Sequence, residues 1–130
     1  MRTILRLVPV FLLMIGAAPD VAAEAVHMWK CETEETVNDS EVKAAAVKWL
    51  TAAKTMPGGA AMEASVYFPV AVNDAADTDI WFVISTPTFE DWGKFWDAYP
   101  GSAAEAIDDQ NVQAGIFCPD SAVFESAKIE

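Results

Sequence analysis

The chain has 130 residues, of which 53% are hydrophobic and 11% aromatic, and its formal net charge is −12 at pH 7. An apolar fraction this high excludes a disordered acidic tail and is sufficient for the core of one compact domain. The sequence contains no phosphate-binding glycine loop, no nucleophile elbow and no paired-histidine zinc motif. The commonest nucleotide-binding, hydrolase and metalloprotease chemistries are therefore not indicated.

The first 23 residues have the features of a cleavable secretory signal. Arg2 and Arg6 precede an apolar run from Leu7 to Ala18, and small residues lead to a cleavage site after Ala23. The alternative is a retained membrane anchor, but the apolar run is well short of the roughly 20 residues that span a bilayer. We therefore predict a signal peptide at 1–23 and a periplasmic or secreted mature protein without a membrane anchor.

The predicted mature chain is strongly acidic. It contains 6 Lys, no Arg and 19 Asp or Glu, which gives a net charge of −13. Binding to nucleic acids or to anionic membranes requires clustered Lys and Arg, so neither partner is expected. The acidity is typical of a protein that stays dissolved outside the cytoplasm. The alternative interpretation is that the negative charge serves to bind a cationic partner.

Two cysteines, Cys31 and Cys118, lie near opposite ends of the mature chain. In an oxidising compartment a single disulfide between them is the default expectation. Two free thiols or a redox pair are the alternatives, although the C-x-x-C spacing of redox pairs is absent. A zinc site would need more Cys and His than the chain contains, so no metal or cofactor site is predicted.

The first half of the mature chain predicts a strand, a helix and a second strand. Residues 25–32 alternate with strand periodicity. From Ser40, apolar residues recur at helical spacing until Pro57-Gly58-Gly59 ends the helix. Residues 63–72 form the second strand, and Pro69 confines it to a sheet edge because proline cannot donate to a ladder.

The second half begins with a short acidic connection, 73–79, whose Asp74, Asp77 and Asp79 could gather calcium but lack the spacing of a calcium-binding loop. A solvated turn is the simpler interpretation. Residues 80–85 then form a third strand, paired with the second as a hairpin.

Two helices and extended chain follow. Thr88 caps an aromatic helix that ends at Pro100-Gly101, and Ser102 caps a short helix that reaches about Asn111. The rest of the chain has extended character over 112–117 and 122–129. A turn is expected between these segments, at Pro119-Asp120.

The order strand, helix, strand, strand, helix, strand is that of the ferredoxin-like βαββαβ fold. We predict one α+β domain over 24–130, with an antiparallel sheet and two main helices on one face. In this fold the last strand lies antiparallel beside the first, which brings Cys31 and Cys118 together. Different residues indicate the topology and the disulfide, and the two expectations agree.

The aromatic helix carries a family resemblance. The segment TPTFEDWGKFWDAYP at 86–100, in this order of elements, resembles the dimeric α/β-barrel superfamily, which includes antibiotic-biosynthesis-monooxygenase-like proteins. The resemblance implies two subunits that pair their open sheet faces, and a ligand pocket between sheet and helices or inside the barrel. The chain lacks the family's catalytic Asn, Trp and His set, so no functional residue is carried over. Export and a disulfide also argue against an intracellular oxygenase.

Strand alternation assigns side chains to the two faces of the sheet. The face expected under the helices carries Val26, Met28, Ala64, Val66, Phe68, Ile80, Phe82 and Ile84. The opposite face is expected to carry His27, Trp29, Ser65, Tyr67, Trp81 and Val83. Such an aromatic face is too apolar to stand bare in water, so we expect a homodimer, with or without an enclosed ligand.

The candidate site residues lie on that second face. His27 is the one side chain whose ordinary pKa is near neutrality, and it is the candidate acid or base if the protein is a cofactor-free enzyme. Trp29 and Trp81 would stack on a ligand, and Tyr67 or His27 would fix its orientation. Ser65 is the remaining candidate for ligand binding.

The aromatic helix offers further candidates. Most of its aromatic side chains are expected in the core, with an outward Phe95 or Trp92 able to line a pocket. Without Arg to clamp an anion, the ligand should be a small neutral or cationic apolar or aromatic molecule. Three classes remain: a non-catalytic binder, a structural or interaction protein, and an enzyme that uses His27.

Overall fold

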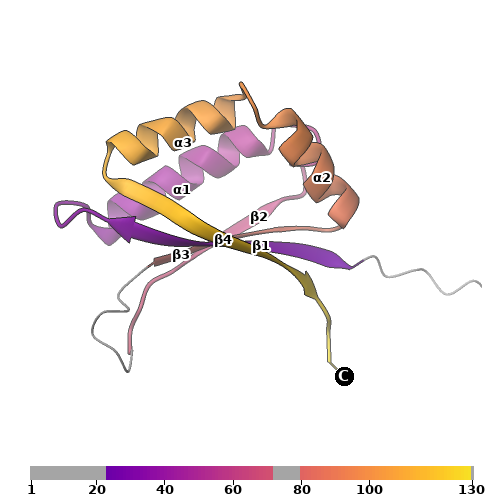
Figure 1. Ribbon diagram of the computed structural model, residues 1–130, viewed down its shortest axis with the longest axis horizontal. Coiled ribbons are helices and arrows are strands. Elements are labelled where there is room, and N and C mark those ends of the chain that lie inside the picture. Colours follow the sequence, from indigo (N-terminus) through magenta and orange to yellow (C-terminus); the bar gives the residue numbers. More distant parts are fainter. Residues whose placement is uncertain (1–22, 72–79, 130) are drawn as a thin grey trace, which may run out of the picture.

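The computed structural model describes residues 23–71 and 80–129 of the chain. Its elements are, in order, β1 (Glu24–Thr33), α1 (Asp39–Ala53), β2 (Glu63–Tyr67), β3 (Ile80–Thr86), α2 (Phe89–Ala98), α3 (Ala103–Gln113) and β4 (Ile116–Ser126). The strands form one antiparallel sheet in the order β2-β3-β1-β4, and the helices all cover the same face of it (Figure 1). The predicted ferredoxin-like α+β sandwich is confirmed.

The third helix is longer than the sequence indicated. α3 continues to Gln113, where extended chain was expected from residue 112. It packs beside α1 above the sheet, and α2 lies at one end of the pair (Figure 1). The helical layer of the described chain therefore has three members rather than two main ones.

The helices begin where side chains satisfy their free backbone N–H groups. Asn38 caps α1, because its Oδ1 accepts from the N–H groups of Ser40 and Glu41 at 3.0 and 3.2 Å. The Glu41 carboxylate accepts the Asn38 N–H at 2.9 Å, which completes a capping box. Thr88 and Ser102 cap α2 and α3 as predicted, and each accepts the N–H three residues on.

The predicted faces of β1 are wrong. In the sheet, His27 is paired with Ile84 and Trp29 with Phe82, and paired residues of antiparallel strands share a face. His27 and Trp29 therefore lie under the helices, and the alternate side chains of β1 lie on the open face. Both sets are apolar, so the alternation identified two faces without showing which one the helices cover. The ring contacts of His27 with Trp92 and Trp96 of α2 show that the set with His27 and Trp29 faces the helices.

Two strand boundaries also differ from the prediction. β2 ends at Tyr67, before Pro69, instead of continuing to residue 72. β4 runs without a break through the predicted turn at Pro119-Asp120, and its pairing with β1 shifts register between Lys30 and Glu32. Because β4 is an edge strand, the missing N–H of Pro119 is tolerated there.

The predicted disulfide is present, and it joins β1 to β4 beside that register shift. Cys31 and Cys118 are 87 residues apart in sequence, and Cys31 is buried with Val42 and Ile80. A second buried cluster surrounds Phe95, which α2 holds against Trp49 of α1 at a ring-centroid distance of 5.8 Å. The disulfide therefore links the edge strand to one of two core clusters.

Some predictions fall on residues outside the described ranges. These are the signal peptide, apart from Ala23, and the acidic connection that contains Asp74, Asp77 and Asp79. Within the ranges that are described, no helix combines the length and the hydropathy needed to cross a bilayer.

Candidate functional site

A cavity of about 250 Å³ lies between the sheet and the helices. All four strands contribute to one wall, and α1, α3 and the C-terminal end of α2 contribute to the other. Val112 lines the cavity and is 49% exposed, which indicates that the cavity reaches the surface at the end of α3. The ferredoxin-like sandwich thus contains a space that its own side chains do not fill.

Aromatic rings form much of the cavity wall. Trp29 of β1 and Phe82 of β3 lie on the sheet side, with ring centroids 5.8 Å apart. Trp49 meets Phe82 edge to face at 5.4 Å from the helix side, and Trp96 lies 5.8 Å from Trp29. Such rings offer a ligand large apolar surfaces and π faces at little cost in side-chain entropy.

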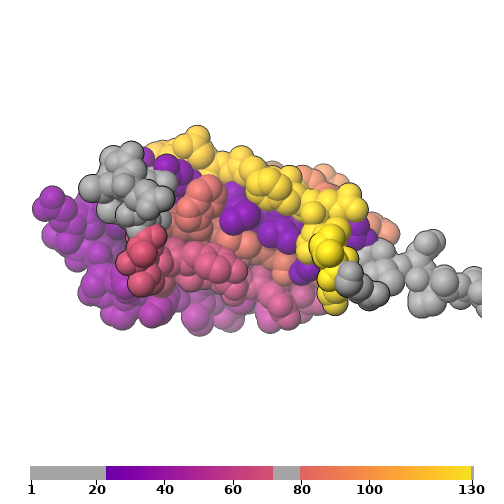
Figure 2. Space-filling model, turned by 90° about the horizontal axis from the view of Figure 1, so that it is seen from below, coloured from indigo at the N-terminus to yellow at the C-terminus, as the bar shows by residue number. Residues whose placement is uncertain are grey.

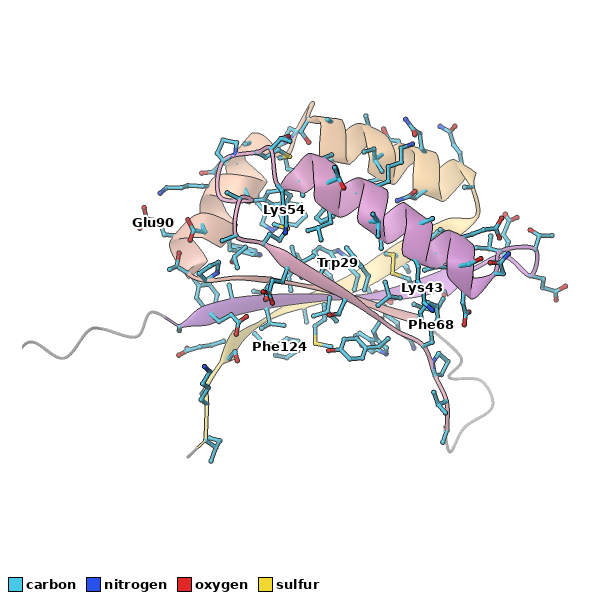
Figure 3. All side chains as sticks on the ribbon, turned by 180° about the vertical axis from the view of Figure 1, so that it is seen from behind. Trp29, Lys43, Lys54, Phe68, Glu90 and Phe124 are labelled. Carbon is cyan, nitrogen blue, oxygen red and sulfur yellow. A yellow bond between two sulfur atoms is a disulfide. The ribbon has the colours of Figure 1, made fainter. Side chains whose placement is uncertain are left out.

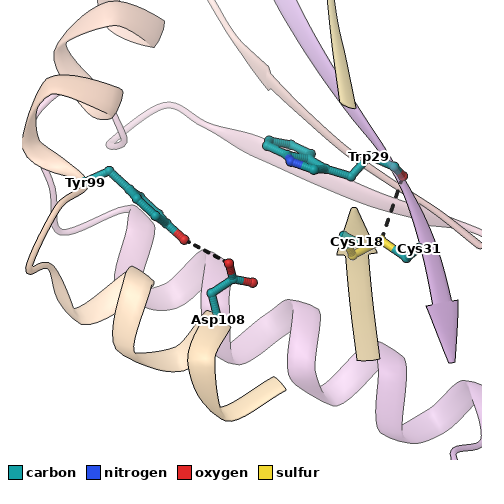
Figure 4. Close-up of a disulfide and its surroundings, with 5 residues drawn as sticks. All are labelled: Trp29, Cys31, Tyr99, Asp108 and Cys118. Atoms are coloured by element: carbon teal, nitrogen blue, oxygen red, sulfur yellow. Dashed lines mark hydrogen bonds between the residues drawn. A yellow bond between two sulfur atoms is a disulfide. The ribbon is translucent and has the colours of Figure 1, made fainter. Parts of the chain in front are cut away.

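One side of the cavity is polar. The Tyr99 hydroxyl donates a hydrogen bond to Asp108 Oδ2 at 3.3 Å, and both residues line the cavity. In Figure 4 this pair faces Trp29 and the disulfide from the helix side. Burial raises the pKa of Tyr99 to about 12 and also raises the pKa of Asp108. Tyr99 is therefore a neutral hydrogen-bonding group at physiological pH.

The Trp96 indole is an unsatisfied donor. Its Nε1 atom is buried and finds no hydrogen-bond acceptor among the described residues. Its nearest ring neighbours are Tyr99 and Phe95, at centroid distances of 4.6 and 5.1 Å. An unpaired buried donor costs about 1–3 kcal/mol. A bound molecule that brought an acceptor to this indole would recover part of that cost.

His27 lies beside the cavity without lining it. It is 8% exposed, stacks on Trp29 at 3.6 Å and meets Trp96 edge to face at 5.4 Å. Trp92 Nε1 donates a hydrogen bond to its Nδ1 at 3.4 Å, so the ring proton is placed on Nε2. Burial lowers the pKa of His27 to about 4. The imidazole is therefore neutral at pH 7 and is a weak base.

The buried imidazole predicts a specific dependence of stability on pH. The unfolded chain takes up a proton near the ordinary pKa of 6.5, and the folded chain only near 4. The contribution of His27 to the free energy of unfolding is therefore fully present above pH 6.5. It decreases by up to about 3 kcal/mol as pH falls toward 4. His27→Gln should lose this component, so its stability relative to wild type should improve by about 2–3 kcal/mol between pH 7.5 and 4.5. Urea denaturation at both pH values measures it, and a constant difference between the two proteins would contradict it.

The remaining predicted site residues lie on the open face of the sheet, away from the cavity. Ser65 and Tyr67 of β2 and Trp81 of β3 share this face with Met28 and Val83, as the strand register shows. Figure 2 looks onto this open face, on the side of the sheet away from the helices. In Figure 3, Trp29 lies between sheet and helices, and Phe124 lies on the opposite side. Tyr67, Trp81 and Phe124 are 57%, 38% and 50% exposed.

The structure therefore separates the predicted site into two. Of the predicted ligand-binding residues, Trp29 lines the cavity, while Ser65, Tyr67 and Trp81 do not. Phe95 is fully buried, and Trp92 packs on His27, so neither is the pocket residue of α2. That role belongs to Trp96 and to Tyr99 at the end of the helix.

Sequence reasoning also missed the polar residues of α3. Asp108 and Asn111 line the cavity, and they share a helical face with Ala104 and Ile107, which pack in the core. Polar residues on an otherwise buried helical face were the available signal.

Comparison with known proteins supports the fold. No family model matches the chain, and no curated protein does. A protein from Arabidopsis thaliana has a TM-score of 0.53 at 7% identity, over 83% of this chain and 96% of that one. A hydroxynitrile lyase from Passiflora edulis has a TM-score of 0.53 at 14% identity, over 82% and 94%.

A third solved structure, a dimeric ferredoxin-like protein of unknown function from Thermobifida fusca, has a TM-score of 0.46 at 16% identity. The similarity covers 82% of this chain and 92% of that one. At such identities the likeness is one of fold. The two structures with TM-scores of 0.53 therefore show a shared fold alone, and the predicted ferredoxin-like resemblance is confirmed at that level.

Proposed function

We propose that this domain binds a small, mostly apolar molecule in the cavity between the sheet and the helices. The observation that carries the proposal is an aromatic-walled cavity of about 250 Å³ with Tyr99 and Asp108 on one side. A few polar groups within an apolar wall are typical of sites that orient a small ligand. An engineered apolar cavity of about 150 Å³ holds benzene, so the space suits one aromatic ring with a short substituent.

The size of the cavity also limits the affinity. A ligand of about ten non-hydrogen atoms with a Kd of about 10 μM gains about −0.7 kcal/mol per atom, which is within the range of small ligands. We therefore expect dissociation constants in the micromolar range, as for a carrier or sensor of a small metabolite.

Filling the cavity from α1 tests the proposal. Ala45 lines the cavity, while the adjacent Ala44 is exposed on the same helix. Ala45→Leu should weaken binding of 2-phenylethanol at least about tenfold, measured by calorimetric titration, because its added carbons occupy the ligand's volume. Ala44→Leu adds the same carbons on the solvent side and should leave binding unchanged. Equal binding by both variants, or no binding by wild type, would contradict the proposal.

The open sheet face supports a homodimer as the form in which the domain acts. Its centre is apolar, with Met28 and Val83 side by side, and Tyr67, Trp81 and Phe124 are exposed around them. A bare patch of this kind is costly in water, and a second copy of the chain would cover it with matching surface. The pairing would leave the cavity of each subunit on the outer side of its sheet.

Export of the mature chain from Glu24 is part of the proposal. The Cys31–Cys118 disulfide supports it, because such bonds persist in oxidising compartments. The alternative of a cofactor-free enzyme has less support, since His27 is a weak base screened from the cavity by Trp29 and Trp96.

A further inference from the structure

The charged groups around the cavity are unevenly distributed. Among the described residues that line the cavity, Asp108 is the one carboxylate and none is Lys or Arg. Lys48 contacts this part of α3 from the exposed side, where its Nζ donates a hydrogen bond to Gln110 Oε1 at 2.7 Å. Asp108 thus faces the cavity with a hydrogen bond from Tyr99 and no ion pair among the described residues.

Neighbouring carboxylates strengthen the negative potential at this side of the cavity. Burial raises the pKa of Asp108, and the charges of Asp109 and Glu105 raise it further. A cation placed against Asp108 would relieve both effects, because it neutralises a partly desolvated carboxylate and offsets its like-charged neighbours. An anion placed there would meet three carboxylates.

The aromatic wall favours the same kind of ligand. Tyr99, beside Asp108, and Trp49 and Trp29, further along the cavity, offer π faces whose negative charge attracts cations. An ammonium group that loses water on entering the cavity therefore finds both a carboxylate and aromatic rings. A neutral hydroxyl finds only a hydrogen bond.

We propose that the cavity selects a primary amine with one aromatic ring, whose ammonium group lies against Asp108 and Tyr99 and whose ring lies among Trp29, Trp49 and Phe82. The inference rests on the proposed ligand-binding function and names the chemical class of the ligand. It assigns Asp108 as the residue that determines specificity.

Three molecules of nearly equal size test the charge preference: 2-phenylethylamine, 2-phenylethanol and phenylacetate. Calorimetric titration of the wild-type protein at pH 7 should show the amine binding at least about tenfold more tightly than the alcohol, with phenylacetate the weakest. Asp108→Asn keeps the shape and the acceptor for Tyr99 but removes the charge. It should reduce amine affinity about tenfold and leave the alcohol unchanged.

Asp109→Asn is the matched control, because it removes the same charge one residue along α3 at a position that does not line the cavity. It should change amine affinity by less than about threefold, since only the long-range attraction is lost. Equal losses in both variants, or equal affinity for amine and alcohol, would overturn the assignment of Asp108. If Ala45→Leu still blocked the alcohol in that case, cavity binding itself would stand. If none of the three molecules bound, both proposals would be overturned.

Discussion

Removal of the disulfide is expected to lower the free energy of unfolding by about 4–5 kcal/mol. The bond joins positions 87 residues apart, and closing a loop of this length removes much of the conformational freedom of the unfolded chain. A domain of this size is stable by only about 5–15 kcal/mol, so the loss is a large share of the total. The measurement is urea denaturation of wild type and of the double variant Cys31→Ala, Cys118→Ala.

A reducing thiol provides the control for this experiment. It should destabilise wild type by the same amount as the double substitution, and it should have no effect on the double variant, which has no disulfide to reduce. If oxidised and reduced wild type were equally stable, the bond would have no role in holding β4 to β1. Removal of the disulfide should also weaken ligand binding, because Ile116 and Phe117 at the start of β4 form part of the cavity wall.

The fold was predictable because its local and long-range signals agree. Thr88 and Ser102 were recognised as helix caps from their spacing to an acidic residue, and both cap as expected. The strand order then predicted where β1 and β4 meet, and the two cysteines are joined at that point. Boundaries were less predictable, because Pro119 signals a turn in an isolated segment and is tolerated in an edge strand.

The site was less predictable, for a geometric reason. Period-two alternation separates the side chains of a strand into two sets but does not show which set faces the helices. For β1, both sets are apolar, and this ambiguity grouped Trp29 with Trp81 although they lie on opposite faces. The cavity also depends on how closely α1 and α3 approach the sheet. No short sequence pattern encodes that separation, so Trp49 and Asp108 were not recognised as neighbours.

The open face leads to the second large effect, which is on assembly. We expect wild type to be a dimer at about 10 μM and Trp81→Glu to be a monomer, with the dimer dissociation constant raised at least about 100-fold. A twofold axis places each substitution in the interface twice, and a buried unpaired carboxylate costs several kcal/mol. Trp81 is 38% exposed in the single chain, so the folded monomer can accommodate the charge. Sedimentation velocity over a range of concentrations measures the change.

A control variant that adds a carboxylate to the helical layer distinguishes burial of the charge in the dimer interface from a general effect of added negative charge. Val47 is 66% exposed on α1, within the helical layer that covers the opposite face of the sheet, and Val47→Glu should leave the dimer intact. Circular dichroism should show both variants folded, because neither position is buried in the single chain. The cavity should still bind 2-phenylethanol in the Trp81→Glu monomer, since Trp81 does not line it. A wild-type protein that stayed monomeric, or a Val47→Glu variant that dissociated as readily as Trp81→Glu, would refute pairing through the open face.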